Sequence, residues 1–445
     1  MAYDVIVIGA GLAGLTAGLE LSERGQKVIL IEKERFVGGR TASWNDNGME
    51  VESGFHRHIG YYKALPEILQ KVGVNINQIV LWENSMEVRV GGTKKSVIWG
   101  IAPFHAPLAF LRGLIGNNHV LSIDDKRSLL PFFLSGFRDY LLYPKKLDQY
   151  SIGEYSQKHK VSERAFISLI VPLSTGIFFL PPEDYSAKVF FGLFAPGIPR
   201  IFHMRVGAYL GGMTDVLSRP IAQGIEKLGG DIRLKTKVKQ LLIEKNRVIG
   251  VSTDHGEQIK AGHTILAADL GQSQILLKNC ERMNPWFRPL LRMPRMSAIT
   301  IQFDLKSRSL PFDRTTFGSQ NLVASFSEQS HSTFKHLPGR LSVITAYSQN
   351  CKDISDETVY NTVIADAKKI GIPLEGNIRD YRVIRHIDKF YHLGPNHDWM
   401  RPTQYCPMAG LTLAGDYTRQ PFYSTMEGAV LSGIKAAKAV VKEKR

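Results

Sequence analysis

The chain has 445 residues, of which 44% are hydrophobic and 22% charged, and it carries a formal net charge of +15 at pH 7. This length exceeds what a single hydrophobic core supports, so we expect two intertwined domains of a globular protein. A basic excess of this size attracts nucleic acid, anionic lipid or anionic substrates. The sequence has neither a zinc-binding cysteine spacing nor a dense Lys/Arg block, which disfavours nucleic acid and leaves a membrane surface as the better partner.

The cysteines and the N-terminus bear on the compartment. Cys280, Cys351 and Cys406 are widely separated and odd in number, so they predict neither a disulfide framework nor a metal site and favour a reducing compartment. The first strand is expected to begin at Tyr3 or Asp4, which leaves no room for a signal or transit peptide. No segment reaches the roughly 18 uncharged apolar residues that a membrane-spanning helix needs. We therefore expect a cytoplasmic protein that holds no metal and does not cross the bilayer.

A glycine-rich turn joins the first expected strand to the first expected helix. The run Val5–Ile8 is apolar on both faces, as in a buried parallel strand. Gly9 permits a sharp turn, Gly11 lets the backbone approach a pyrophosphate, and Gly14 lets the helix pack close to its strand. The free N–H groups and positive dipole end of that helix favour phosphate. These glycines predict the first turn of a dinucleotide-binding, Rossmann-like domain.

The second expected strand ends at an acidic residue and leads into another glycine turn. Glu32 closes the run Val28–Glu32, where its carboxylate can accept hydrogen bonds from both hydroxyls of an adenosine ribose. This motif alone does not separate NAD from FAD. Gly38, Gly39 and Arg40 then add a second turn with a guanidinium for phosphate, a pattern that resembles the two-dinucleotide-binding flavoproteins. FAD is therefore the expected cofactor.

A loop rich in histidine, arginine and tyrosine occupies residues 52–62. Its side chains are crowded between glycines and suit contact with a flavin or its pyrophosphate. A surface loop with hydrogen-bonded histidines is the alternative, and the sequence leaves both open.

Residues 96–150 combine short apolar stretches with basic residues. Ile98–Phe104 and Leu108–Ile115 are interrupted by Pro and Gly, and a helix is expected from Asp124 to Tyr143 with Lys126 and Lys145 beside it. Apolar and aromatic residues next to Lys and Arg are typical of a helix that lies in the bilayer interface. A helical cap whose apolar side is core is an equal alternative. The Phe-, Gly- and Pro-rich segments 172–182 and 189–199 slightly favour the lining of an apolar channel over ordinary core.

The second half of the chain returns to the dinucleotide-binding domain and leaves it again. A helix is predicted from Asp215 to Leu228. The strands predicted after it form a meander over Ile232–Ile243, Val248–Thr253 and Gln258–Ala261. In this arrangement Val238 would meet the adenine through its backbone. A substrate domain of sheet and helix follows, with strands at Ser297–Leu305 and Leu341–Tyr347 and a helix at Asp356–Ile370.

The C-terminal segment again has the pattern of strand, turn and helix. The strand from Gly410 delivers Gly415 and Asp416, whose carboxylate can hold a ribityl or ribose hydroxyl. The last helix opens at Glu427, just after Met426. A helix N-terminus aimed at the pyrimidine edge of a flavin would stabilise the negative charge that develops there on reduction.

These motifs together resemble the FAD-dependent amine oxidase superfamily and, within it, the plant and cyanobacterial type of phytoene and ζ-carotene desaturases. The resemblance covers Val5–Arg40, continues through residues 52–62, and is most specific at residues 413–420 and 426–433. It implies an α/β fold with a discontinuous Rossmann-like FAD-binding domain, an α+β substrate domain and a membrane-surface helical segment. The expected boundaries are 1–95, 206–270 and 408–445 for the FAD-binding domain, 96–205 for the helical region and 271–407 for the substrate domain.

The resemblance also implies contacts with FAD, which should be bound non-covalently. The residues concerned, together with the motif glycines Gly9, Gly11, Gly14, Gly39 and Gly415, are Ala13, Glu32, Lys33, Arg40, His56, Arg57, Val238, Asp416 and Met426. Arg57 stands where the desaturases usually have an apolar residue, which suggests a different environment near the cofactor.

The reaction implied by the resemblance removes two hydrogens from adjacent carbons of an apolar isoprenoid chain, one as hydride to flavin N5 and one as a proton. Glu427, His56 and Tyr423 are the groups singled out for proton removal. Electrons would pass to a quinone or to oxygen, and the protein would lie at the inner face of the membrane, as a monomer or an oligomer. The alternatives on this fold are a hydroxysqualene dehydroxylase, a carotenoid isomerase, an amine oxidase and a non-enzymatic prenyl-binding escort protein. The intact glycines, Glu32 and Asp416 argue against the last of these.

Overall fold

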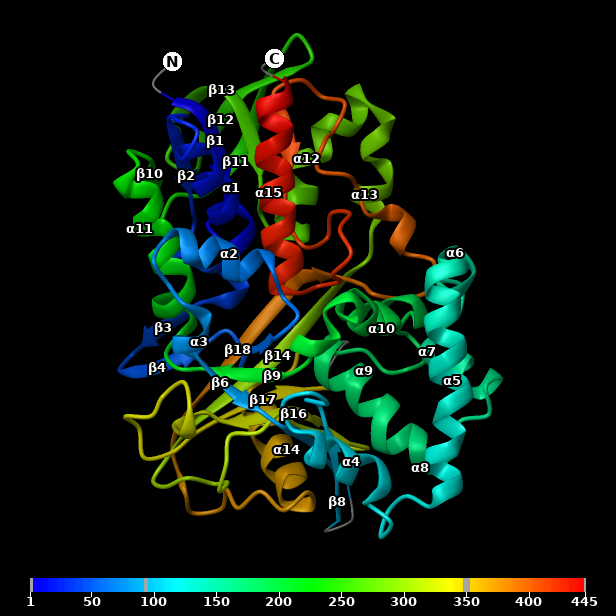
Figure 1. The fold of residues 1–445 in the computed structure, drawn as a ribbon. Coiled ribbons are helices and arrows are strands. Elements are labelled where there is room, and N and C mark those ends of the chain that lie inside the picture. Colours follow the sequence, from blue (N-terminus) through cyan, green and yellow to red (C-terminus); the bar gives the residue numbers. More distant parts are fainter. Residues whose placement is uncertain (1–2, 92–94, 347–352, 444–445) are drawn as a thin grey trace.

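The computed structural model describes residues 3–91, 95–346 and 353–443, and Figure 1 shows its elements. The first of two seven-stranded sheets has the order β10-β2-β1-β13-β12-β11, with β19 paired to β13. Its strands are β1 (Tyr3–Ile8), β2 (Val28–Ile31), β10 (Asp231–Arg233), β11 (Val238–Glu244), β12 (Arg247–Thr253), β13 (Gln258–Leu266) and β19 (Leu411–Leu413). The strand β1 is parallel to both β2 and β13, and Val5, Ile6 and Val7 are fully buried, as its sequence predicts.

Three helices pack together beside this sheet. They are α1 (Leu12–Ser22), α11 (Arg219–Lys227) and α15 (Met426–Glu443). The helices α1 and α15 come from opposite ends of the chain and lie side by side in Figure 1. The Cβ of any residue at Gly433 would lie 2.4 Å from the Ala13 carbonyl oxygen, so a glycine permits the close contact between these two helices. The FAD-binding domain is therefore assembled from separate segments, as predicted.

The prediction of one strand over Ile232–Ile243 was wrong. The chain turns at Lys235, which has a φ of 52°, and this turn separates β10 from β11. Hydrogen bonds from the amides of Lys235 and Thr236 attach the turn to Glu34 and Glu32 at the end of β2. In addition, β13 extends to Leu266 and thereby joins the meander to the parallel sheet.

The second seven-stranded sheet has the order β18-β14-β17-β16-β15-β7-β8. Its strands are β7 (Ser85–Val90), β8 (Ser96–Gly100), β14 (Arg295–Leu305), β15 (Thr316–Ser319), β16 (Val323–Glu328), β17 (Arg340–Thr345) and β18 (Ile378–Tyr391). The helix α14 (Asp356–Lys369) packs against β16 and β18. The predicted strand at Ser297–Leu305 and the helix at Asp356–Ile370 are confirmed, whereas Tyr347 and Cys351 lie outside the described residues.

The second sheet shifts the expected domain boundary at residue 95. The strand β7 is parallel to β15, with Glu87 opposite Thr316, so residues 85–90 belong to the substrate domain. The next strand, β8, continues the same sheet instead of starting a helical region. A small sheet of β5 (Arg57–Ile59), β9 (Val206–Tyr209) and β6 (Val80–Glu83) adjoins it. Pairing between strands more than 200 residues apart leaves no local trace in the sequence.

A helical region stands beside the two sheets and is seen on the right of Figure 1. It comprises α4 (Pro107–Ile115), α5 (Ile123–Leu142), α6 (Pro144–Leu147), α7 (Ile152–Lys158), α8 (Glu163–Ala165), α9 (Val171–Phe178), α10 (Ala187–Phe194) and the 3-10 segment η3 (Ala195–His203). The predicted helix from Asp124 is α5, which begins after a capping box between Ser122 and Asp125. No helix in the described ranges is long and apolar enough to cross a bilayer.

Candidate functional site

One cavity of about 1450 Å³ extends from the glycine-rich turn to the helical region. At one end its walls are polar and glycine-rich and come from the first sheet, α15 and β18. At the other end they are apolar and include Trp99, Leu129, Phe133, Phe137, Leu173 and Phe178. Single ligand sites usually measure about 300–1,000 Å³, so this cavity has room for more than one large ligand.

The glycine turn forms a cradle at the polar end. Gly9 has a φ of 100°, which disfavours any residue with a Cβ. A Cβ at Gly14 would lie 2.0 Å from the Gly9 carbonyl oxygen, so this glycine allows α1 to pack against the turn. A Cβ at Gly11, in contrast, would meet nothing within 4 Å and would project into open space. Gly11 and Ala13 line the cavity at the N-terminus of α1, where a phosphate is expected to bind.

The acid at the end of β2 is fixed by backbone amides. The Glu32 carboxylate accepts hydrogen bonds from the amides of Ala10 (2.8 Å) and Glu34 (3.0 Å). Burial raises the pKa of Glu32 above its usual value, while these two hydrogen bonds oppose the rise. Lys33 and Val238 line the same end of the cavity. The carboxylate oxygens keep lone pairs that could accept hydrogen bonds from ribose hydroxyls, and this role of Glu32 stays a prediction.

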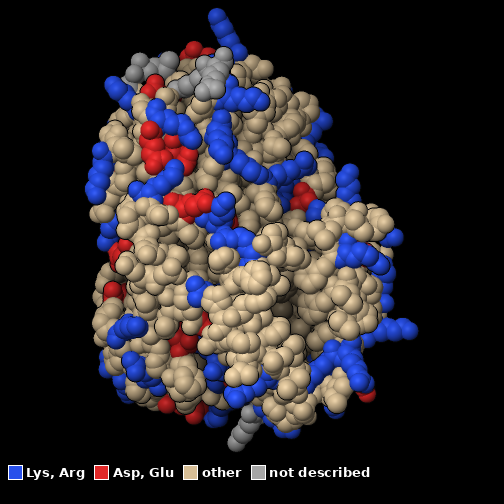
Figure 2. Space-filling model, in the orientation of Figure 1, with Lys and Arg blue, Asp and Glu red and all other residues tan. Residues whose placement is uncertain are grey.

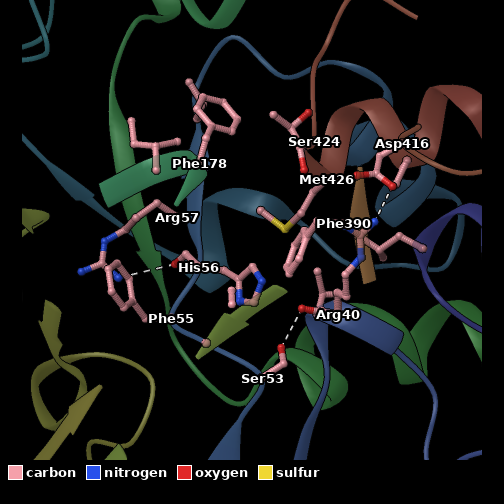
Figure 3. Close-up of a pocket in the computed structure, with 18 of the residues that line it drawn as sticks. Arg40, Ser53, Phe55, His56, Arg57, Phe178, Phe390, Asp416, Ser424 and Met426 are labelled. Atoms are coloured by element: carbon pink, nitrogen blue, oxygen red, sulfur yellow. Dashed lines mark hydrogen bonds and ion pairs between the residues drawn. The ribbon is translucent and has the colours of Figure 1, made fainter. Parts of the chain in front are cut away.

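An ion pair between Arg40 and Asp416 joins the two ends of the chain at the site. The Arg40 guanidinium also lies 4.8 Å from the centre of the Phe390 ring, and Figure 3 shows this group beside Met426. Burial lowers the pKa of Arg40, but the Asp416 carboxylate outweighs it and raises the pKa. The second carboxylate oxygen of Asp416, Oδ2, is buried and has no hydrogen-bond partner among the described residues. A ligand hydroxyl would satisfy it.

Two histidines line the cavity near this pair, the half-buried His56 and the buried His386. Burial lowers the pKa of His56 to about 4 and that of His386 to about 3, so both are neutral at pH 7. The His386 Nε2 lies 2.6 Å from the Ser53 carbonyl oxygen, which can only accept, so Nε2 carries the proton. The Nδ1 of each histidine has no hydrogen-bond partner within the described part of the chain. Sequence reasoning missed His386 because β18 carries no local motif.

Arg57 lines the cavity, but its charge is already neutralised. The guanidinium forms ion pairs with Glu83 (2.7 Å) and Asp313 (2.6 Å), and in Figure 3 it points away from the space beside His56 and Met426. Burial lowers the pKa of Arg57, but the two carboxylates outweigh it and raise the pKa. The side chain thus links β5 to β6 and to the segment before β15. Because two carboxylates neutralise its charge, we do not expect it to bind an FAD phosphate.

Two residues singled out for proton removal do not line the cavity. The Glu427 carboxylate accepts hydrogen bonds from the amides of Lys63, Ala64 and Leu65, and thereby caps α2 (Ala64–Lys71). Tyr423 is buried, and the Arg401 guanidinium lies 4.6 Å from the centre of its ring. Both side chains have structural partners, so His56 alone is retained from the predicted set.

The residues at the polar end fit FAD. An open cradle stands at Gly11, a ribose acid at Glu32 and an unsatisfied oxygen at Asp416, and all three line one cavity. Gly39, with a φ of 58°, and Gly415, with a φ of 138°, line it as well, and both conformations favour glycine. Among residues 3–91, 95–346 and 353–443, no group of three or more His, Cys, Asp or Glu could hold a metal ion.

Comparisons with known proteins agree with this geometry. A family model described as flavin-containing amine oxidoreductase matches residues 12–441. A 15-cis-phytoene desaturase from Synechococcus elongatus is 25% identical, over 98% of this chain and 95% of the relative. A zeta-carotene desaturase from Synechocystis is 27% identical, over 98% and 97%.

Solved structures show the same fold at lower identity. An oxidoreductase from Methanosarcina mazei aligns with a TM-score of 0.76 at 19% identity, over 98% of this chain and all (100%) of the other. A putrescine oxidase bound to putrescine aligns with a TM-score of 0.74 at 16% identity, over 99% of each chain.

Proposed function

Because the chain belongs to the family of flavin-containing amine oxidoreductases and is an FAD-dependent enzyme, we propose that it desaturates a long apolar isoprenoid chain at a membrane surface. The relatives that act on such chains, by their names, are similar to this protein over nearly its whole length. The expected substrate class is therefore the carotenoid type.

The observation that carries this proposal is the composition of the single cavity. Its acidic lining residues, Glu32, Glu34, Asp269 and Asp416, lie at the end built by the first sheet. Trp99, Leu173 and Phe178 help to line the other end, where none of the described residues offers a carboxylate to an ammonium group. A hydrocarbon chain fits such walls, whereas a charged amine would be desolvated without a partner.

The protein's own residues bind and orient the two ligands. Glu32 and the amides at the start of α1 would hold the adenosine and pyrophosphate, and Asp416 would hold a hydroxyl of the ribityl chain. When bound, FAD supplies the two-electron oxidation. The apolar walls would exclude water and hold the chain in one register. A substrate chain that is held in place presents its reacting carbons to the flavin more often than a mobile one, so this positioning raises the rate of the reaction.

His56 is the proposed acceptor for the proton that leaves the substrate. It is neutral at pH 7, its Nδ1 has no hydrogen-bond partner among the described residues, and it lines the cavity. A base with a pKa of about 4 is weak, but the proton lost from an oxidised allylic chain is strongly acidic. Substitution of His56 by phenylalanine would then slow turnover while FAD stays bound.

The helix α5 carries the proposed membrane contact. Ile123, Leu130, Leu134 and Leu141 are at least 61% exposed, and their spacing places them on one face of the helix. Arg127 and Arg138 lie on the same solvent-facing side. Apolar residues flanked by cations are typical of a helix in the plane of an anionic bilayer. The net charge of +15 supports the same partner.

The proposed membrane contact surrounds the apolar end of the cavity. Leu114 of α4, Leu130 of α5 and Ile201 of η3 are all exposed, and all three line the cavity. Figure 2 shows a hollowed, uncharged area low on the visible face, with Lys and Arg along its sides. A lipid-borne chain could pass from the bilayer into the cavity without crossing water.

A substrate panel tests the proposal. Phytoene, ζ-carotene, hydroxysqualene, a poly-cis carotenoid and a simple amine would each be offered in liposomes to the FAD-loaded protein, with mass analysis of the products. We expect one polyene to lose two hydrogens per step. Replacement of the hydroxyl by hydrogen after the flavin has been reduced, a net loss of one oxygen, would indicate a dehydroxylase. An unchanged mass with new geometry would indicate an isomerase, and oxidation of the amine alone an amine oxidase. Each of these three outcomes would contradict desaturation.

A further inference from the structure

A small hollow lies beside the C-terminal end of α5, apart from the large cavity. It measures about 130 Å³ and is lined by Arg138, Asp139, Tyr143, Lys146, Tyr150 and Lys158. We infer that this hollow binds the phosphate of an anionic lipid headgroup. The inference rests on the proposed membrane contact and adds to it a specific site for one kind of lipid.

The charges around the hollow favour an anion. Arg138, Lys146 and Lys158 contribute three positive charges, and Asp139 is the one acid among the described residues that line the hollow. Lys146 and Lys158 form no ion pair within the described part of the chain. The Lys158 ammonium lies 4.4 Å from the centre of the Tyr150 ring and 3.3 Å from its hydroxyl oxygen. Neither ammonium group is therefore neutralised by a carboxylate partner within the described residues, and both can contact a bound phosphate, Lys158 while it keeps its hydrogen bond to Tyr150.

A series of hydrogen bonds that ends at a buried tyrosine holds the wall of the hollow in place, although the Arg138 side chain is itself exposed. The Arg138 guanidinium donates to Asp139 Oδ1 from Nε (2.9 Å) and Nη2 (2.7 Å). The other Asp139 oxygen, Oδ2, accepts a hydrogen bond of 2.9 Å from the hydroxyl of Tyr155, which is fully buried. These contacts lower the pKa of Asp139 against the opposing effect of its burial, so its charge is retained. The site is thus ordered before a ligand arrives.

The position of the hollow points to a lipid as the source of the phosphate. Leu141, Leu142 and Tyr143 are 67%, 64% and 56% exposed and end the apolar face of α5 beside the hollow. Tyrosine and basic side chains are typical of the headgroup level of a bilayer. A volume of about 130 Å³ admits a phosphate group together with a few waters.

Vesicle partitioning of the full-length, FAD-loaded protein tests the inference. Vesicles of phosphatidylcholine alone would be compared with vesicles that contain one-fifth phosphatidic acid. The test variant is K146Q/K158Q, which leaves the Arg138–Asp139 pair intact. The matched control is K145Q/K160Q, which removes the same charge from two exposed lysines of the same region that do not line the hollow.

We expect phosphatidic acid to strengthen binding of the unaltered protein at least tenfold. K146Q/K158Q should lose most of that gain, whereas the control should retain it within about threefold. Equal losses in the two variants would show that binding depends on overall charge alone and would overturn the inference. Equal binding to both kinds of vesicle would overturn it as well, while leaving the membrane contact intact. Absence of binding to any vesicle would overturn the membrane contact too.

Soluble ligands distinguish the source of the phosphate. Titrations with inorganic phosphate and with monomeric, short-chain phosphatidic acid would be followed by the fluorescence of the tyrosines at the hollow. We expect the lipid to bind at least tenfold more tightly, because its chains can contact Leu141 and Leu142. Equal affinities would mean that the hollow binds free phosphate and would contradict a lipid site.

Discussion

The two ends of the large cavity are built in different ways. At the cofactor end, backbone atoms set the shape: a Cβ at Gly14 would lie 2.0 Å from the Gly9 carbonyl oxygen, and two amides hold the Glu32 carboxylate. At the channel end, side chains on separate helices set the shape, and several of them, such as Leu130, are exposed. A single substitution should therefore disrupt the cofactor end. The channel end should respond to the total apolar area that is lost or gained.

Two glycine-to-alanine substitutions at the cofactor end should have different effects, one on the stability of the fold and the other on FAD affinity. Gly14→Ala would force a Cβ against backbone, so we expect unfolding free energy to fall by about 3 kcal/mol or more. Gly11→Ala adds a Cβ in open space, so stability without FAD should stay unchanged while FAD affinity falls about 100-fold. Chemical denaturation of the apoprotein and FAD titration would measure these effects. A Gly11→Ala protein that binds FAD normally would contradict the assigned cradle.

Removal of the carboxylate at the C-terminal motif should weaken both FAD binding and the fold. Asp416→Ala leaves Arg40 without its ion-pair partner, which we expect to cost about 2 kcal/mol of unfolding free energy. FAD affinity should fall by about tenfold or more, because the free oxygen of Asp416 would no longer meet a hydroxyl. Asp416→Asn keeps one acceptor and should lose less of both. Equal FAD affinities for the two variants would contradict the proposed hydrogen bond between Asp416 and an FAD hydroxyl.

At the channel end, a negative charge added to the exposed face of α5 should weaken binding to membranes and leave FAD binding unchanged. Leu134→Asp should reduce partitioning into vesicles about tenfold, since one exposed leucine is lost and one negative charge is gained. The matched control is Ile275→Asp on α12 (Leu270–Met283), because Ile275 is 63% exposed but lies outside this face. FAD content should be normal in both. An equal loss in the control would contradict a localised membrane contact.

The histidines of the cofactor end should make the apoprotein sensitive to mild acid. In the unfolded chain a histidine takes up a proton below a pKa of about 6.5, whereas the folded protein resists it down to about 3 at His386. Stability is therefore lost as the pH falls below 6.5. His386→Asn should reduce this loss by about 1 kcal/mol between pH 6.5 and 5.5. Chemical denaturation at the two pH values measures the difference. If the variant lost as much unfolding free energy between them as the unaltered protein, a neutral, buried His386 would be contradicted.

The same contrast explains what the sequence could and could not predict. The turn around Gly9 and the end of β2 before Glu32 are local features, and the sequence predicts both of them. The helix α5 was also predicted, but its apolar residues fitted a core as well as a membrane surface. The exposure of these residues depends on where the neighbouring helices pack, which the sequence of α5 does not determine.

Long-range pairing accounts for most of what was missed. The strand β7 joins a partner more than 200 residues away, and His386 reaches the cavity from the middle of β18. Glu427 stands at the start of a helix, which suggested a role at the flavin, yet its carboxylate caps a different helix through three backbone amides. Such partners cannot be read from spacing along the chain.

The most direct test of this account is whether a lipid-borne chain reaches the flavin through the channel. Leu173→Trp would obstruct the apolar end of the cavity, and Leu173→Met would serve as the control that conserves volume. Anaerobic bleaching of the flavin absorption would be followed after mixing with liposomes that contain the active polyene. We predict rapid bleaching for the unaltered protein and the methionine variant, and at least 100-fold slower bleaching for the tryptophan variant at equal FAD content. Bleaching of all three proteins at the same rate would contradict a single cavity that joins the membrane to the cofactor.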